Sequence, residues 1–280
     1  MYGLSDVMCF FLYRVFRYRR AVVRSNITQA FPSKTFEEIS TIERRFYRHF
    51  CDLAFESIKA LTISEDEARK RMHVHNPELI NALYEQHRSL VLYSGHQGLW
   101  EWLLFLPLWL RHDIVCFYKP LRSNYFDGLM QAIRRRLSGG LVPSDQGYRT
   151  ILRHQQDNHT ILSIMIGDQS PRSQDAKHWC YFLGRPTAFL IGAGKIAAKS
   201  GQAVVFPEFQ KRRRGYYQLR FQLLHEGGPA RTESIIEAYA GALEHAIAQQ
   251  PELWLWSHRR WKLNDKNLAP KDMQATRAQT

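Results

Sequence analysis

The sequence lacks any apolar run long enough to cross a bilayer as a helix, which takes about 18 consecutive apolar residues. The two longest candidates are residues 7–16, which Arg14 interrupts, and residues 102–110, which Pro107 interrupts. Each is half a span at best. A polytopic membrane protein is therefore excluded.

Cysteine is also scarce, and the four that occur are far apart, with no C-x-x-C pair. Such spacing excludes a small disulfide-stapled secreted domain and favours reduced thiols. The 45% hydrophobic and 13% aromatic content excludes global disorder. These cysteines are Cys9, Cys51, Cys116 and Cys180.

Acidic residues are outnumbered, 26 against 39 Lys and Arg, which gives a formal charge of +13. This excess predicts an anionic partner: a nucleic acid, an acidic protein or a membrane surface. Residues 1–25 join an aromatic, apolar stretch to a group of arginines, as interfacial segments do. We interpret residues 1–25 as an amphipathic, basic, membrane-proximal segment, with a core helix carrying a solvated basic end as the alternative. The arginines are Arg14, Arg17, Arg19, Arg20 and Arg24.

From residue 89 onward, short apolar runs typical of strands alternate with helical patterns. This alternation predicts an α/β fold, with a mostly parallel central sheet flanked by helices in a single domain. Residues 26–87 have helical spacing and form a helical N-terminal extension. We expect one domain over residues 26–265 and a flexible tail over 266–280. The expected strands are 89–93, 113–118, 141–142, 160–166, 203–206 and an antiparallel strand within 215–224.

The strongest chemical signal is the stretch from Gly95 to Glu101, where a strand ends and a helix begins. Open α/β sheets hold their ligands at such places. His96 has a side chain that titrates near neutral pH, and a carboxylate such as Glu101 can orient it as a general base. The pair can meet only if His96 precedes the helix and Glu101 lies in its first turn. The alternative is a surface histidine and a helix-terminal carboxylate that never meet.

The H-x-x-x-x-E spacing of His96 and Glu101 resembles that of the bacterial lipid A biosynthesis acyltransferases of the lysophospholipid acyltransferase superfamily. Further stretches resemble the blocks of this family in order, over roughly residues 18–262. Tryptophans of the last block are expected in the core, and its arginines Arg259 and Arg260 at the mouth of the active site. The blocks lie at residues 20–26, 30–32, 118–136, 167–171, 182–195 and 254–262.

The resemblance implies an enzyme on the cytoplasmic face of the bacterial inner membrane. It would move a fatty acyl chain from acyl carrier protein, or coenzyme A, to a hydroxyl of a glycolipid, the lipid A precursor, without metal or cofactor. His96 would be the general base and Glu101 its partner. Arg134 or Arg136 would bind a substrate phosphate or the developing oxyanion, and Asp168 and Gln169 would lie beside the substrate. Members carry a longer apolar anchor than residues 2–16, so peripheral attachment and a missing anchor are both open.

Two other functions remain open at this point. One is the same chemistry on a lysophospholipid or another glycolipid or aminolipid. The other is a non-catalytic basic module that binds membranes or nucleic acid, although no nucleic-acid-binding signature occurs and we expect no such partner. A nucleotide site at Gly192–Ala197 lacks its acidic residue, and His73 and His75 lack further metal ligands. An acyl-chain pocket is expected near Leu104, Leu108 or Trp109.

Overall fold

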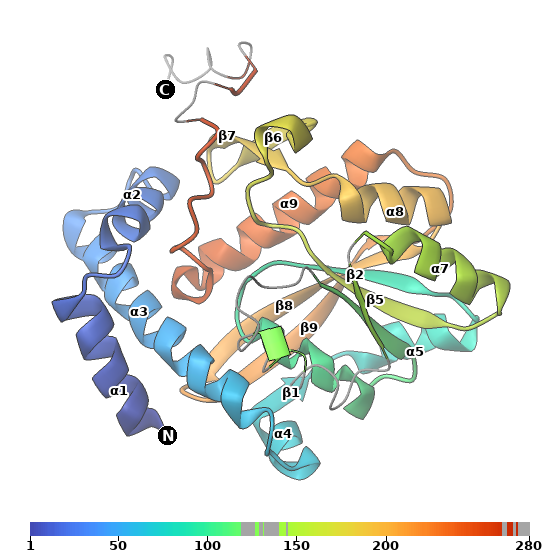
Figure 1. Cartoon of the computed structure of the whole chain (residues 1–280), viewed down its shortest axis with the longest axis horizontal. Helices are drawn as coiled ribbons and strands as arrows, with labels where there is room; N and C mark the ends of the chain where they lie inside the picture. The colour runs from blue at the N-terminus through green and yellow to red at the C-terminus, as the bar shows by residue number, and fades with distance from the viewer. Residues whose placement is uncertain are drawn as a thin grey trace.

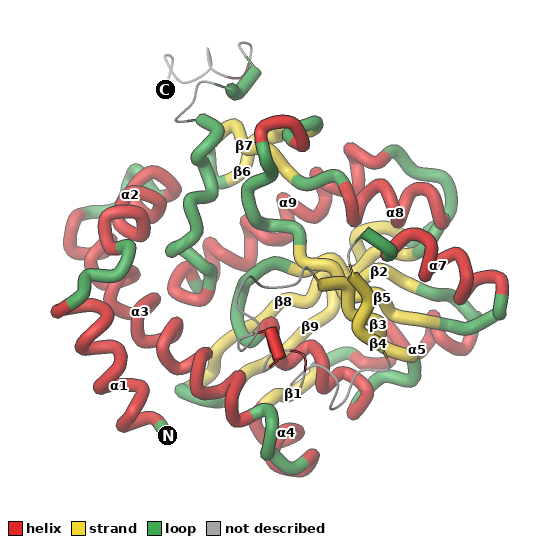
Figure 2. Tube along the Cα trace, viewed as in Figure 1, coloured by secondary structure: helices red, strands yellow, loops and turns green. Residues whose placement is uncertain are grey.

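A central sheet organises the protein (Figures 1 and 2). In the computed structural model, seven strands of the described residues form this sheet, in the order β1-β9-β8-β2-β5-β3-β4. Their bounds are β1 Met72–Val74, β2 Leu90–Ser94, β3 Asp113–Tyr118, β4 Gly140–Pro143, β5 Ile161–Ile166, β8 Ala203–Arg213 and β9 Tyr216–His225. The structure describes residues 1–118, 127–128, 131, 140–143, 145–264, 268–270 and 273.

Most strand pairs are parallel, which confirms the predicted α/β fold. β2 lies between β5 and β8 and is parallel to both, and β3 lies between β5 and β4 in the same sense. The exception is the β8–β9 hairpin, which is antiparallel, as the alternation within 215–224 predicts. A separate antiparallel pair joins β6 (His178–Phe182) to β7 (Arg185–Phe189).

Helices cover both faces of the sheet, so its central strands are buried on both sides. Every residue of β2 is buried. Val91 and Tyr93 belong to one hydrophobic cluster, together with α8 (Gly192–Ser200) and α9 (Thr232–Gln249). Leu90 and Leu92 belong to a second cluster on the other face, with α4, α5 and η2. After the N-terminal part, the other helices of the described residues are α4 Glu65–Arg71, α5 Pro77–Glu85, α7 Gly147–Gln156 and the 3₁₀ segments η2 Trp100–Leu108, η3 Ser173–Asp175 and η4 Pro251–Leu253.

The N-terminal part is helical, as predicted. α1 (Tyr2–Phe10) continues as the short π-helix η1 (Phe11–Val15), followed by α2 (Arg20–Ala30) and the long α3 (Phe36–Lys59). A capping box starts α3, because the Thr35 hydroxyl accepts from the Glu38 amide and the Glu38 carboxylate accepts from the Thr35 amide.

Ion pairs tie these helices to the domain. Arg214, in the β8–β9 turn, binds Asp6 of α1 and the fully buried Asp52 of α3. Arg20 and Arg24 of α2 each place Nε 2.6 Å from a carboxylate oxygen of the buried Glu43. Two of the five N-terminal arginines therefore have a carboxylate partner among the described residues.

Candidate active site

The candidate site lies where β2 and β5 end. These neighbouring strands run parallel, with Ser94 opposite Ile166. Because both strands end at the same edge of the sheet, the residues that follow them come together there. The Gly167 amide donates to the Ser94 carbonyl at 3.0 Å, so the pairing of the two strands continues to the residue after β5. A side chain at Gly167 would collide with the Tyr93 ring, so only glycine fits this close approach.

His96 and Asp168, 72 residues apart in the chain, form the centre of the site. His96 Nδ1 lies 2.6 Å from Asp168 Oδ1, and the His96 backbone amide donates to Oδ2 at 2.8 Å. The indole of Trp254 also donates to Oδ2, at 2.8 Å. The carboxylate is thus held by three donors while it orients the imidazole, an arrangement that suits a general base.

The charge of Asp168 follows from these contacts. Its side chain is only 3% exposed, and burial alone would raise its pKa. The electrostatic attraction of His96 and the hydrogen bonds from His96 and Trp254 outweigh burial and lower the pKa of Asp168 to about 2. Asp168 is therefore ionised at neutral pH, and the proton of the pair belongs on His96 Nδ1.

The other ring nitrogen of His96, Nε2, lies on the partly exposed side of the ring, beside Gln169. Nε2 lies 3.3 Å from the side-chain nitrogen of Gln169, and the His96 side chain is 20% exposed. With its proton on Nδ1, the imidazole presents an unprotonated Nε2 that can accept a proton from a hydroxyl group.

Glu101 lies where the sequence analysis requires it, in the first turn of η2, while His96 precedes this 3₁₀ segment. The indole nitrogen of Trp100 donates to Glu101 Oε1 at 3.3 Å, and the Trp100 ring packs edge-on against the His96 ring. The contact with Nδ1, which we expected of Glu101, belongs to Asp168. The role of Glu101 stays a prediction.

The family of the chain follows from comparison with known proteins. The profile of the bacterial lipid A biosynthesis acyltransferases matches residues 4–263, nearly the whole chain. The chain belongs to this family. It is an enzyme that transfers acyl groups and acts on a lipid A-like substrate. None of the curated proteins matches the chain.

In this acyltransferase, residues that the sequence analysis did not select support the site. The His96 carbonyl accepts from the Leu255 amide at 3.1 Å, so the C-terminal segment runs beside the histidine. His258 Nε2 accepts from the Ser170 amide at 3.0 Å. Burial and the nearby Arg260 lower the pKa of His258 to about 4, which keeps it a neutral acceptor. These residues lie in the terminal block of the family resemblance, the one signal that pointed to them.

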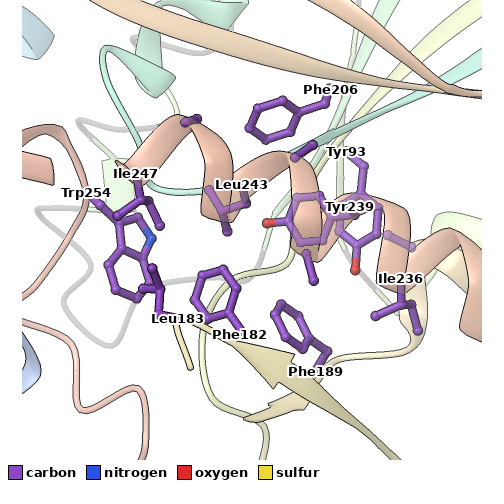
Figure 3. Close-up of a cluster of buried hydrophobic side chains, with 14 of the residues drawn as sticks. Tyr93, Phe182, Leu183, Phe189, Phe206, Ile236, Tyr239, Leu243, Ile247 and Trp254 are labelled. Carbon is purple, nitrogen blue, oxygen red and sulfur yellow. The ribbon is translucent and has the colours of Figure 1, made fainter. Parts of the chain in front are cut away.

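A closely packed aromatic cluster lies beneath the site. Tyr93 and Tyr239 stack with ring centroids 3.7 Å apart, and the Tyr239 hydroxyl donates to the Ser94 carbonyl at 2.8 Å. Figure 3 shows these two rings side by side, with Trp254 at the other end of the cluster. The cluster therefore fixes the end of β2 from which His96 projects.

An apolar cavity of about 220 Å³ opens beside the end of β5 in this acyltransferase. It includes Gly167, the residue before Asp168, and otherwise belongs to the face of the sheet that α8 covers. Leu104, Leu108 and Trp109, where we expected an acyl-chain pocket, lie in or against the cluster on the other face. The cavity is lined by Tyr93, Phe117, Gly147, Met165, Ile166, Gly167, Leu190, Gly192, Ala193 and Ile196.

Two expected binding residues of the enzyme, Arg134 and Arg136, lie outside the described residues, and their role stays a prediction.

Among the residues that the structure describes, no helix combines the length and the apolar character needed to traverse a bilayer.

Proposed function

We propose that this acyltransferase moves a fatty acyl chain from acyl carrier protein to a hydroxyl of a lipid A precursor, with His96 as the general base. One observation carries the proposal: Asp168 holds His96 Nδ1 at 2.6 Å, and Nε2 faces the partly exposed side with Gln169. A histidine oriented in this way can activate an alcohol without a covalent enzyme intermediate.

The reaction proceeds in two steps. His96 Nε2 takes the proton from the acceptor hydroxyl while its oxygen attacks the thioester carbonyl, which forms a tetrahedral oxyanion. Collapse of the oxyanion breaks the carbon–sulfur bond and forms the ester. The imidazolium returns its proton to the departing thiolate, and Asp168 stabilises the imidazolium between the two transfers.

Other groups at the site act on the substrate rather than on the proton. Gln169 offers a neutral amide beside Nε2, placed to hydrogen-bond the acceptor hydroxyl or the oxyanion. Arg134 or Arg136 would bind the phosphate of the glycolipid, as the family resemblance implies. Glu101 would act as a second carboxylate that assists His96.

An acidic carrier protein fits the charge of the enzyme. In the basic stretch at the β8–β9 turn, Lys211 and Arg214 are engaged by Asp52. Arg212 and Arg213 beside them are exposed. We assign the docking of the carrier to such exposed basic positions, because the formal charge of +13 favours an acidic partner.

We also propose that α1 and η1 attach the enzyme to the cytoplasmic face of the inner membrane. These elements lie at the periphery of the fold (Figure 1), and together with Phe16, which follows η1, they expose six large apolar side chains. Exposed apolar residues next to arginines are typical of segments that lie in the membrane interface. The six are Leu4 (65% exposed), Val7 (55%), Phe10 (58%), Phe11 (46%), Val15 (53%) and Phe16 (71%).

This attachment is tested with vesicles. Replacing both Phe10 and Phe16 by Ser removes two apolar side chains worth about 1.5–3 kcal/mol each when fully buried, so sedimentation with anionic vesicles should weaken on the order of 100-fold. Ile58→Ser, which changes an apolar side chain that is 50% exposed on α3, is the matched control and should bind like the wild type. Equal binding by the double variant would contradict the proposal. Raising the salt concentration should release part of the wild-type protein.

The apolar cavity is the slot that we assign to the acyl chain. A side-chain carbon built at Gly192 meets no atom within 4 Å, so Gly192→Phe should fill the slot without disturbing α8. If three methylene groups lose their place, at about 0.8 kcal/mol each, kcat/KM for the preferred donor falls on the order of 50-fold, while shorter donors are spared. Gly241→Phe, at an exposed and equally open position on α9, is the control. An unchanged chain-length profile in Gly192→Phe would place the acyl chain elsewhere.

The function itself is tested on lipids. Mass spectrometry should find a lipid A species that gains one acyl chain in cells with the protein and lacks it in cells without it. Purified enzyme should transfer labelled acyl groups from acyl carrier protein to the lipid A precursor. Transfer to a lysophospholipid alone would favour the other acceptor class.

A further inference from the structure

One buried cation has no role in the mechanism described above. The Arg260 side chain is 2% exposed, although its position in the terminal block led us to expect it at the mouth of the site. All three guanidinium nitrogens lack a hydrogen-bond partner among the described residues. The guanidinium lies over the Phe189 ring, 4.5 Å from its centroid. A buried charge without partners is costly, so its retention calls for a counter-charge nearby.

The aromatic cluster connects Arg260 to the active site. Phe189 packs against Phe182, Phe182 packs against Trp254, and Trp254 donates to Asp168. Burial lowers the pKa of Arg260 to about 10, and the negative charge of Asp168 is the strongest influence that opposes this shift. Arg260 therefore remains a cation at neutral pH, and Asp168 is the carboxylate whose negative charge favours that cationic form.

Among the groups that face Arg260, Asp168 supplies the negative charge. Burial raises the pKa of Cys180 on β6 to about 11, and raises the pKa of Tyr93 on β2 and of Tyr239 on α9. These three groups are neutral at pH 7. His258, on the same segment as Arg260, is neutral as well, because burial lowers its pKa to about 4.

Charge balance elsewhere in the protein supports this pairing. The buried Glu43 and Asp52 are each bound by two cationic side chains, and the buried Glu56 is bound by two tyrosine hydroxyls. Among the described residues, Asp168 has no lysine or arginine within ion-pair distance, and its donors other than the His96 ring are neutral. Among these direct contacts, only a protonated His96 would bring positive charge to Asp168.

We propose that Arg260 is a positioning residue whose fixed charge balances Asp168, so that His96 stays a neutral imidazole whose Nε2 is available as the base. The proposal rests on the function of His96 proposed above. A carboxylate alone would draw a proton onto His96, which would consume the base before the substrate arrives. A permanent cation that acts on the same carboxylate opposes this protonation of His96. The Glu101 carboxylate, in the first turn of η2, acts in the opposite direction.

The test is the titration of His96 in substrate-free, full-length enzyme, followed by NMR of labelled histidine and assigned with His96→Gln. Arg260→Met should raise the pKa of His96 by about one unit or more and move the acid limb of the kcat/KM profile by the same amount. Arg260→Lys keeps the charge and should titrate like the wild type. Arg259→Met, a change of the exposed neighbour, should leave the titration unchanged.

Each outcome decides the proposal. An unchanged His96 titration in Arg260→Met, or an equal shift in Arg260→Lys, would overturn it. If Arg260→Met does not fold, addition of Asp168→Asn should restore folding, because the charge to be balanced is then gone; a double variant that stays unfolded would show that Arg260 only fills space. A His96→Ala variant that still transfers acyl groups would instead remove the proposed base, and the NMR titration would still report on Arg260.

Discussion

His96→Ala should lower kcat/KM for acyl transfer on the order of 10³-fold, because a positioned general base contributes roughly 10²–10⁴-fold to such reactions. The loss arises in the chemical step, because His96 is the ring that Asp168 holds by Nδ1 and that presents Nε2 toward Gln169. The measurement is transfer of a labelled acyl group from acyl carrier protein to the lipid A precursor at saturating and limiting donor.

His245→Ala is the matched control for this experiment. His245 is exposed on α9, and its replacement should leave transfer unchanged. Both variants should retain most of the near-UV circular dichroism of the wild type, since Trp254, Trp256 and Trp261 pack against one another in the core. A His96→Ala enzyme that retains most of its activity would eliminate the proposed mechanism.

The second large effect is expected for Asp168→Asn, at roughly 10³–10⁴-fold in kcat. An amide can no longer stabilise the imidazolium, and it can hold the imidazole in the wrong tautomer, as a comparable substitution does in a serine protease triad. The fold should survive at reduced stability: the charge of Arg260 loses its balance, but the amide oxygen can still accept from the indole of Trp254 and from the His96 backbone.

Glu101→Gln is the informative comparison for Asp168→Asn. Both substitutions replace a carboxylate by an isosteric amide, but Asp168 contacts Nδ1 directly. We expect Glu101→Gln to lower turnover and to shift its pH dependence by less than Asp168→Asn does. A larger loss in Glu101→Gln would assign the orienting role to Glu101 and leave Asp168 as a structural acceptor.

The strands were predictable because their signal is local. A run such as residues 160–166 is apolar throughout, as a strand covered on both faces must be, and β5 indeed spans Ile161–Ile166 with all but its last residue buried. The bounds of β3 also agree, since this strand is predicted at 113–118 and found at Asp113–Tyr118. The prediction that the terminal tryptophans fill the core is confirmed as well, since Trp254, Trp256 and Trp261 are at most 3% exposed.

The orienting carboxylate could not be found in this way. Spacing along the chain favours Glu101, five residues from His96, because a local sequence pattern can relate only residues that are close in the sequence. Asp168 is brought to His96 by the adjacency of β2 and β5, and strand order is set by how the whole sheet packs. From the sequence alone, Asp168 is only a polar residue at the end of a predicted strand, so we expect it beside the substrate. Its contact with His96 Nδ1 appears only in the structure.

Arg260 illustrates the same limit for charge. An arginine in a basic terminal stretch is expected at the surface, since burying it is costly, and its burial becomes reasonable only once Asp168, a distant residue, is seen across the aromatic cluster.

Hydrophobic periodicity and composition thus establish the α/β architecture and the basic character, and together with the family blocks they indicate the candidate histidine, because each of these signals lies in short stretches of chain. Which carboxylate holds that histidine, which face of the sheet carries the apolar cavity and which cation lies behind the carboxylate depend on contacts between segments far apart in sequence. Those contacts form only when the strands take their order and exclude water, and no short stretch of residues encodes them.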